Sequence, residues 1–256
     1  MKKVFLVPVY NEEKNLPRLL DAIGWFARTK NWDFVIYAVN DGSVDGTLKV
    51  LAFYEGRVPL KVFSLEKNSG PGAAFKRGFQ EILKGEGEDA LIITLEADST
   101  SDLSILESMA NKAEGGVDLV LASCYADGGG IKGTTLSRRM MSMSANFMIG
   151  LMSMRPDIKT YSSFYRIYRY PAISRLYKLY GKDFMEETGF ACAVELFMKL
   201  ARLRISIEEV PMLLDCKRRI GKSRMKVLPT ILAYFRIFCR SVMRGVSFWM
   251  ITKKRT

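Results

Sequence analysis

Residues 3–47 read KVFLVPVYNEEKNLPRLLDAIGWFARTKNWDFVIYAVNDGSVDGT. Short apolar runs at 4–9 and 34–39 are typical of strands that are buried on both faces. Between them, apolar residues recur at helical spacing over residues 13–27. A strand, a helix and a second strand in this order predict two parallel strands joined by a right-handed crossover.

The same alternation continues to about residue 122. Three further apolar runs predict buried strands, at 60–65, 90–95 and 118–122. Three further helical patterns lie at 45–54, 71–83 and 103–113. Shorter elements are expected near 163–168, 171–180 and 189–203, whereas the Gly-rich residues 127–135 are expected to be mobile. This order predicts an α/β fold with a mostly parallel central sheet flanked by helices.

The composition limits the functions open to the chain. Lys and Arg total 39 against 27 Asp and Glu, and the formal net charge of +12 favours anionic partners such as nucleotide phosphates or an acidic membrane surface. There is no histidine, which excludes Ser-His and Cys-His nucleophile pairs. The four cysteines form no CxxC pair, so we expect reduced thiols.

The end of the chain predicts an amphipathic helix. Over residues 227–251, Arg236, Arg240 and Arg244 recur at helical spacing beside aromatic residues. Such a helix either lies in a membrane interface or docks its apolar face on the domain. We expect one domain over 1–226 and an appended helix in 227–256. With no secretory signal and no spanning helix in the sequence, we expect a cytoplasmic protein, peripheral at the cytoplasmic face of a membrane.

Polar residues follow four of the expected strands. The carboxyl ends of parallel strands meet at one edge of a sheet, so these loops are expected to form one ligand site. The loops are PVYNEE at 8–13, NDGSVDGT at 40–47, KNSGPG at 67–72 and EAD at 96–98.

The carboxylates in these loops are candidate ligands. Glu96 and Asp98 can hold Mg²⁺ or Mn²⁺, which would bridge a diphosphate and neutralise its charge. The alternative is a polar strand end in which Asp98 caps the next helix. Asp41 is a candidate acceptor for hydrogen bonds from a nucleobase, while Asp45 is expected to cap the helix that follows.

Basic residues supply candidate phosphate sites. Lys67 belongs to a loop that either cradles phosphate at a helix N-terminus or simply starts a helix, and the chain has no P-loop motif. The run KRRIGKSR at 217–224 either clamps a diphosphate or lipid phosphate, or is a solvated or nucleic-acid-binding surface. Arg138 and Ser142 lie four residues apart in a helical stretch and can hold a second phosphate.

In their order, these motifs resemble the family 2 glycosyltransferases with the GT-A fold. The group most similar is that of the dolichyl-phosphate mannose synthases and polyprenyl-phosphate glycosyltransferases, and the resemblance covers roughly residues 3–240. The motifs that carry it are PVYNE at 8–12, NDGS at 40–43, RGF at 77–79, EAD at 96–98, SSFYR at 162–166, GF at 189–190 leading to Glu195, EVP at 209–211, and RxxGxSR at 218–224.

This resemblance implies an inverting, metal-dependent transfer of a sugar, mannose or glucose, from a GDP- or UDP-sugar to a polyprenyl or dolichyl phosphate. Glu96 and Asp98 would hold the Mg²⁺ or Mn²⁺ and, with Arg218, would be catalytic. The acceptor phosphate would meet Arg138, Ser142 and Ser223. The residues implied to bind the nucleotide-sugar are Pro8, Tyr10, Glu12, Asp41, Ser43, Lys67, Glu96, Ala97, Asp98, Arg218 and Arg224.

A lipid phosphate is already ionised, so positioning and charge stabilisation suffice without a histidine base. The Met-rich stretch 140–154 favours contact with a lipid chain. The sequence departs from the family pattern at Glu96, which replaces an aspartate, at Thr100, which replaces a glutamine, and at Cys124, which replaces an acceptor-binding arginine.

Cys124 keeps open the alternative of transfer to a soluble or polysaccharide acceptor. A third alternative is a non-catalytic binder of nucleotide-sugars or nucleic acid. The carboxylate loops would repel phosphate backbones, so we expect no nucleic-acid partner.

Overall fold

A computed structural model describes residues 1–153, 155–221 and 229–241. The chain divides into two compact units, Met1–Lys222 and Ser223–Thr256. In the second unit, residues 229–241 are helical, and the remainder of the helix expected over 227–251 lies outside the described residues. Within the described ranges, every helix is too short or too polar to cross a membrane.

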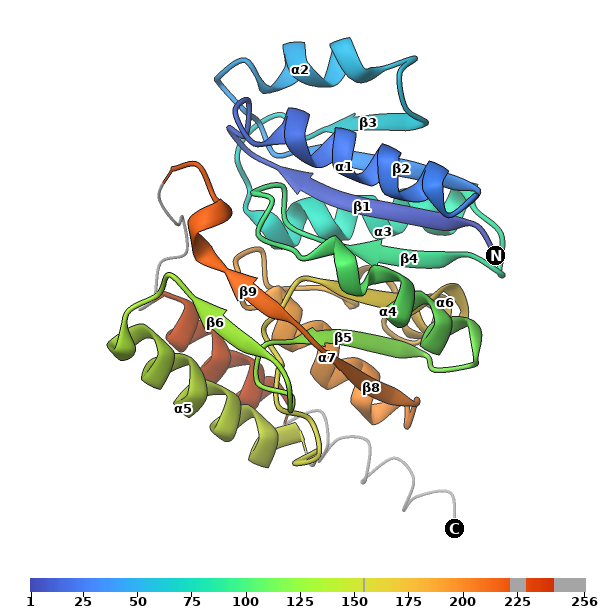
Figure 1. The fold of residues 1–256 in the computed structure, drawn as a ribbon. Helices are drawn as coiled ribbons and strands as arrows, with labels where there is room; N and C mark the ends of the chain where they lie inside the picture. The colour runs from blue at the N-terminus through green and yellow to red at the C-terminus, as the bar shows by residue number, and fades with distance from the viewer. Residues whose placement is uncertain (154, 222–228, 242–256) are drawn as a thin grey trace. The chain divides into compact units, whose positions relative to one another are not determined.

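A seven-stranded sheet with the order β3-β2-β1-β4-β7-β5-β8 forms the centre of the first unit (Figure 1). Neighbouring strands are parallel except at β7, which runs antiparallel to β4 and β5. The α/β fold with a mostly parallel sheet is therefore confirmed. The strands are β1 (Lys3–Val9), β2 (Phe34–Asn40), β3 (Leu60–Ser64), β4 (Leu91–Thr94), β5 (Leu119–Ser123), β7 (Arg166–Arg169) and β8 (Ile207–Pro211).

Helices cover both faces of this sheet, with α1 and α4 on one face and α3, α6 and α7 on the other (Figure 1). Side chains of α1, α2 and α4 share one apolar core with the sheet residues Phe5, Val7 and Ile36. Short η turns adjoin α4 and α6. The elements are α1 (Leu16–Thr29), α2 (Thr47–Tyr54), α3 (Pro71–Gly85), η1 (Leu103–Ile105), α4 (Leu106–Glu114), α6 (Tyr170–Tyr180), η2 (Gly181–Asp183) and α7 (Cys192–Arg202).

One expectation about strands was wrong. β3 was expected to be buried, but as the edge strand it has one neighbour and none of its residues is fully buried. The Gly-rich residues 127–135 contain a strand for which no prediction was made, β6 (Gly130–Lys132), which pairs in parallel with β9 (Leu213–Asp215) in a separate sheet. Glycine has low intrinsic strand preference, so the local composition hid a strand whose partner lies far along the chain.

Helix α5 (Leu136–Ser153) contains most of the Met-rich stretch and has an unusual orientation. Asn146, Ile149 and Gly150 lie on its buried face, which is small and polar apart from the isoleucine. A surface helix normally turns its apolar side inward. Here six large apolar side chains are at least half exposed: Leu136, Met140, Met143, Phe147, Met148 and Leu151.

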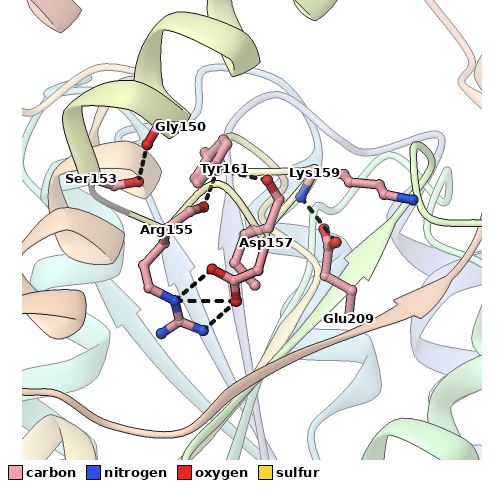
Figure 2. Close-up of polar contacts among 8 residues, drawn as sticks. Gly150, Ser153, Arg155, Asp157, Lys159, Tyr161 and Glu209 are labelled. Atoms are coloured by element: carbon pink, nitrogen blue, oxygen red, sulfur yellow. Dashed lines mark hydrogen bonds and ion pairs between the residues drawn. The ribbon is translucent and has the colours of Figure 1, made fainter.

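Tyr161 anchors the C-terminal end of α5 and the segment that follows it (Figure 2). Its hydroxyl lies 2.6 Å from the carbonyl oxygens of both Arg155 and Ile158, and its side chain is buried. Gly150 passes so close that a Cβ atom there would lie 2.9 Å from the Tyr161 hydroxyl. The tyrosine therefore fixes the end of the helix that presents the apolar surface.

We expect Tyr161→Phe to lower the free energy of unfolding by about 1–3 kcal/mol, because buried carbonyl oxygens lose their donor. Urea denaturation followed by circular dichroism measures this change. Tyr177→Phe is the matched control, since the described residues show a ring contact with Phe184 but no hydrogen bond from the Tyr177 hydroxyl. Equal stability of the two variants would contradict the anchoring role.

Candidate active site

The four polar loops meet at one edge of the sheet, as the sequence predicts. Val9 at the end of β1 is level with Asn40, and Asn40 is level with Ser64, so the first three strands end together. β4 ends at Thr94, opposite Leu6 of β1. This register brings loops from distant parts of the sequence into contact.

Hydrogen bonds join the first and second loops directly. The N–H of Asn11 donates to Ser43 Oγ at 2.9 Å, and the N–H of Val44 donates to Asn11 Oδ1 at 2.8 Å. The N–H of Glu12 donates to Thr47 Oγ1 at 2.9 Å. Asn11 has a φ of 50°, a left-handed conformation that is uncommon outside glycine and often marks a functional loop. Ser43 thus holds the loop, and its contact with a nucleotide stays a prediction.

Asp41 ties the second loop to the third. Its Oδ1 accepts the N–H of Ser69 at 2.7 Å and its Oδ2 accepts the N–H of Gly70 at 2.8 Å. Burial raises the pKa of Asp41 although these two N–H groups lower it. Contact of Asp41 with a nucleobase stays a prediction. Asp45 Oδ1 accepts the N–H of Thr47, the first residue of α2, at 3.0 Å. The N-cap position itself is Gly46 and not Asp45, so the predicted cap is one residue away from the observed one.

The start of α3 is covered by protein rather than open to phosphate. The N–H of Gly72 donates to the Thr188 carbonyl at 2.7 Å, and a Cβ at Gly72 would lie 2.1 Å from the Glu187 carbonyl oxygen. The third loop therefore begins a helix and does not cradle phosphate at that helix end. Lys67 lies exposed in the same loop, and its contact with a nucleotide stays a prediction.

Asp98 is the most tightly bound carboxylate of the site. Its Oδ1 accepts the N–H of Thr100 at 3.0 Å and the Thr100 hydroxyl at 2.6 Å. Its Oδ2 accepts Nε of Arg219 at 2.5 Å and is also paired with Nη2. The same Nη2 lies 3.9 Å from Glu96 Oε1. Asp102, not Asp98, caps the following η1 turn, so the helix-cap alternative for Asp98 is wrong.

The charges of this cluster depend on one another. Burial and, to a smaller extent, the charge of Asp98 raise the pKa of Glu96, Arg219 opposes them, and the resulting pKa is about 8. Burial alone would lower the pKa of Arg219, but the two carboxylates raise it. At neutral pH and without a ligand, Glu96 therefore keeps its proton while Asp98 is balanced by Arg219.

This donor set suits a hard cation. Carboxylate oxygens are preferred ligands of Mg²⁺ and Mn²⁺, and Asp98 Oδ2 already binds a cationic group. In the described part of the chain, no three Cys, Asp or Glu side chains are grouped to hold a metal. Such an ion would need further oxygens from water or from a diphosphate, so the pair fits a metal that arrives with its phosphate ligand.

The structure brings Arg219, rather than Arg218, to the carboxylates. Arg218 lies exposed in η3 (Cys216–Arg218), and its contact with a diphosphate stays a prediction. Asn15 holds Ile220, the residue after Arg219. Its Nδ2 donates to the Ile220 carbonyl and its Oδ1 accepts the Ile220 N–H, both at 3.1 Å. Sequence reasoning missed Asn15 and Arg219.

The remaining predicted residues line the same edge or fall outside the described residues. Tyr10 and Glu12 are half-buried in the first loop, Pro8 is half-buried at the end of β1, and Ala97 is buried between the carboxylates. Ser142 lies in α5. Ser223, Arg224 and the side chain of Arg138 lie outside the described residues, so their roles stay predictions.

A neutral thiol occupies the place where an acceptor-binding arginine was expected. Burial raises the pKa of Cys124 to about 11, so this side chain is uncharged at neutral pH. The next residue, Tyr125, has a buried hydroxyl close to that of Ser142, yet it finds no partner at hydrogen-bond geometry among the described residues.

A mostly parallel sheet with helices on both faces and carboxylates in the loops at one edge is an α/β arrangement in which ligands bind at the carboxyl ends of the strands. The family model for glycosyl transferase family 2 matches residues 4–177, so the chain belongs to this family. It is 25% identical over 230 residues to the polyprenol monophosphomannose synthase of Mycolicibacterium smegmatis, covering 88% of this chain and 81% of that protein. It is 26% identical over 238 residues to the dolichol-phosphate mannosyltransferase of Pyrococcus furiosus, covering 92% of this chain but 62% of the relative.

Solved structures support the same fold. The crystal structure of Mycobacterium tuberculosis glucosyl-3-phosphoglycerate synthase aligns with a TM-score of 0.60 and 16% sequence identity, covering 91% of this chain and 80% of that one. At this identity the likeness establishes the fold alone. The expected GT-A arrangement is therefore confirmed, and the expected glycosyltransferase class is confirmed by the family match.

We expect Asp41→Asn to lower the free energy of unfolding by about 1–3 kcal/mol, because an amide NH₂ would face one of the two backbone N–H donors. Urea denaturation measures the loss. Asp89→Asn is the control, since Asp89 is exposed at the opposite end of β4. Unchanged stability of the Asp41 variant would refute its role in joining the second and third loops.

Proposed function

We propose that this protein transfers a sugar from a nucleotide-sugar to a polyprenyl phosphate, with inversion, in a reaction that depends on a divalent metal ion. The observation that carries the proposal is the Glu96–Asp98 pair at the loop edge of a family 2 sheet. The names of the two curated relatives support a polyprenyl phosphate acceptor and mannose as the sugar.

The carboxylate pair serves the leaving group. Asp98 and Glu96 would hold Mg²⁺ or Mn²⁺, and the ion would supply neutralisation of the charge on the departing nucleoside diphosphate. Arg219, and Arg218 beside it, can bind the diphosphate oxygens with their guanidinium groups. The acceptor phosphate oxygen attacks the anomeric carbon as the bond to the diphosphate breaks. Because that oxygen is already ionised, no histidine base is required.

The α5 side of the site suits the acceptor phosphate. Ser142 and the buried hydroxyl of Tyr125 are neighbouring donors there. Arg138, one turn before Ser142, would supply the charge that Cys124 lacks. This arrangement supports placing the acceptor phosphate between α5 and the end of β5.

The outward apolar face of α5 supports a peripheral membrane position. Its six large apolar side chains include Phe147 and Leu151, which are 69% and 66% exposed. Arg139 at the start of the helix is also exposed. An apolar face with basic residues at its margin suits an anionic lipid surface, where a polyprenyl chain would lie.

Transfer to a soluble or polysaccharide acceptor is the second candidate. Cys124 favours it, because a neutral thiol stands at the position expected to bind an acceptor phosphate. The two candidates differ in where the labelled product partitions.

We expect labelled sugar to enter a product that extracts into organic solvent and is released by mild acid. Purified protein would be incubated with GDP- or UDP-sugar, Mg²⁺ or Mn²⁺, and polyprenyl phosphate in detergent. Product confined to the aqueous phase would refute the lipid acceptor and favour the second candidate.

Asp98→Asn is expected to lower turnover about a hundredfold or more, because a metal ion supplies several kcal/mol of charge stabilisation at the leaving group. Asp89→Asn, at the far end of β4, is the control for loss of one carboxylate charge. Turnover in the Asp98 variant equal to that of the control would exclude a metal-dependent reaction at this pair.

We expect Phe147→Glu to weaken binding to vesicles that contain anionic phospholipid about tenfold or more, since burying such an apolar side chain contributes about 1.5–3 kcal/mol. Trp25→Glu is a matched control, because Trp25 of α1 has the same exposed fraction of 69%. Co-sedimentation with vesicles measures the affinity. Equal loss in both variants, or none in either, would argue against α5 as the lipid-facing surface.

A further inference from the structure

The segment 215–221 carries Arg219 to the carboxylates of Glu96 and Asp98. Hydrogen bonds hold this segment near both of its ends. At its start, Asp215 Oδ1 accepts the N–H of Lys217 at 3.0 Å. Near its end, the N–H and the carbonyl of Ile220 meet the two ends of the Asn15 amide, each at 3.1 Å. This pairing fixes the orientation of the amide, since only its NH₂ can donate and only its oxygen can accept. Asn15 Nδ2 also donates to Glu12 Oε2 at 2.6 Å.

Gly221 follows Ile220 directly and is the last described residue of this segment. Gly221 has a φ of 103°, a region that residues with a side chain rarely adopt. With Ile220 held by Asn15, the preceding residue Arg219 is placed against Asp98. The Arg219 side chain is three-quarters buried, and the side chain of its partner Asp98 is almost completely buried.

Both oxygens of Asp98 are engaged in this arrangement. Oδ1 accepts two hydrogen bonds from Thr100, and Oδ2 is taken by Nε and Nη2 of Arg219. A metal ion coordinated by Asp98 needs one of these oxygens, and a cation cannot approach Oδ2 closely while a guanidinium covers it. The observed position of Arg219 and a metal ion on Asp98 Oδ2 therefore exclude each other.

We propose that Asn15 and Arg219 form a latch that closes the metal site when no donor is bound. Arg219 is the internal counter-ion of Asp98, and Asn15 is a positioning residue that holds Arg219 there through Ile220. The latch rests on the metal site of the proposed function. When metal and diphosphate enter together, the metal takes the Asp98 oxygen, and the released guanidinium lies beside diphosphate oxygens that it can bind.

A closed latch lowers the apparent affinity for metal alone by the fraction of molecules that are open. We expect Arg219→Gln to bind Mn²⁺ about tenfold more tightly than the unmodified protein in the absence of nucleotide. Asn15→Ala changes no charge but frees Ile220, and we expect a gain in the same direction. Electron paramagnetic resonance of free Mn²⁺ measures the affinity, and thermal unfolding verifies that each variant is folded.

Lys217→Gln is the control for loss of one positive charge in the same segment, and we expect it to change Mn²⁺ affinity less than about twofold. A gain in Arg219→Gln without a gain in Asn15→Ala would assign the effect to charge alone and would overturn the latch. Equal Mn²⁺ affinity in all variants, with binding lost in Asp98→Asn, would overturn the latch but leave the metal site standing. Binding insensitive to Asp98→Asn would refute both.

Discussion

The pairing of β1 with a parallel neighbour on each side is the constraint on which the site depends. β1 is almost completely buried between β2 and β4, and its register with both strands is continuous. Parallel strands that start at one edge end at the other, so the loops after them are brought together whatever their own sequences are. The buried strands thus fix the positions of the loops, and the loops supply the functional side chains Asp41, Glu96 and Asp98.

The first half of the fold could be predicted because its signals are local. Continuous apolar runs marked the strands up to β5, and helical spacing marked the helices between them. The features that the sequence did not predict share one cause: they depend on contacts with residues that are distant in the sequence. β6 exists because β9 pairs with it, and β3 is exposed because it has a neighbour on one side only. α5 followed the expected pattern of a helix, but its apolar side faces outward, which periodicity alone cannot reveal.

The site could be predicted at the level of loops but not of contacts. The loops after parallel strands meet at one edge of the sheet, which predicted the common location of Glu96, Asp98 and Asp41. The family motifs predicted a phosphate-binding role for the basic residues 217–224. No sequence signal connects Asn15 with Ile220, because an asparagine before an apolar helical pattern indicates an ordinary cap. Arg219 was missed since the motif assigned the diphosphate to its neighbour Arg218. Contacts between residues so distant in sequence emerge only when the chain is folded.

Charge balance explains why an arginine closes this site. Two neighbouring carboxylates in a poorly solvated place cannot both remain charged without compensation. The protein compensates in two ways, with a proton on Glu96, whose pKa is about 8, and a guanidinium on Asp98. Both compensations are reversible, and the divalent cation of the proposed reaction would replace them together. In the proposed reaction, the basic segment that neutralises Asp98 would therefore also be the one that meets an incoming diphosphate.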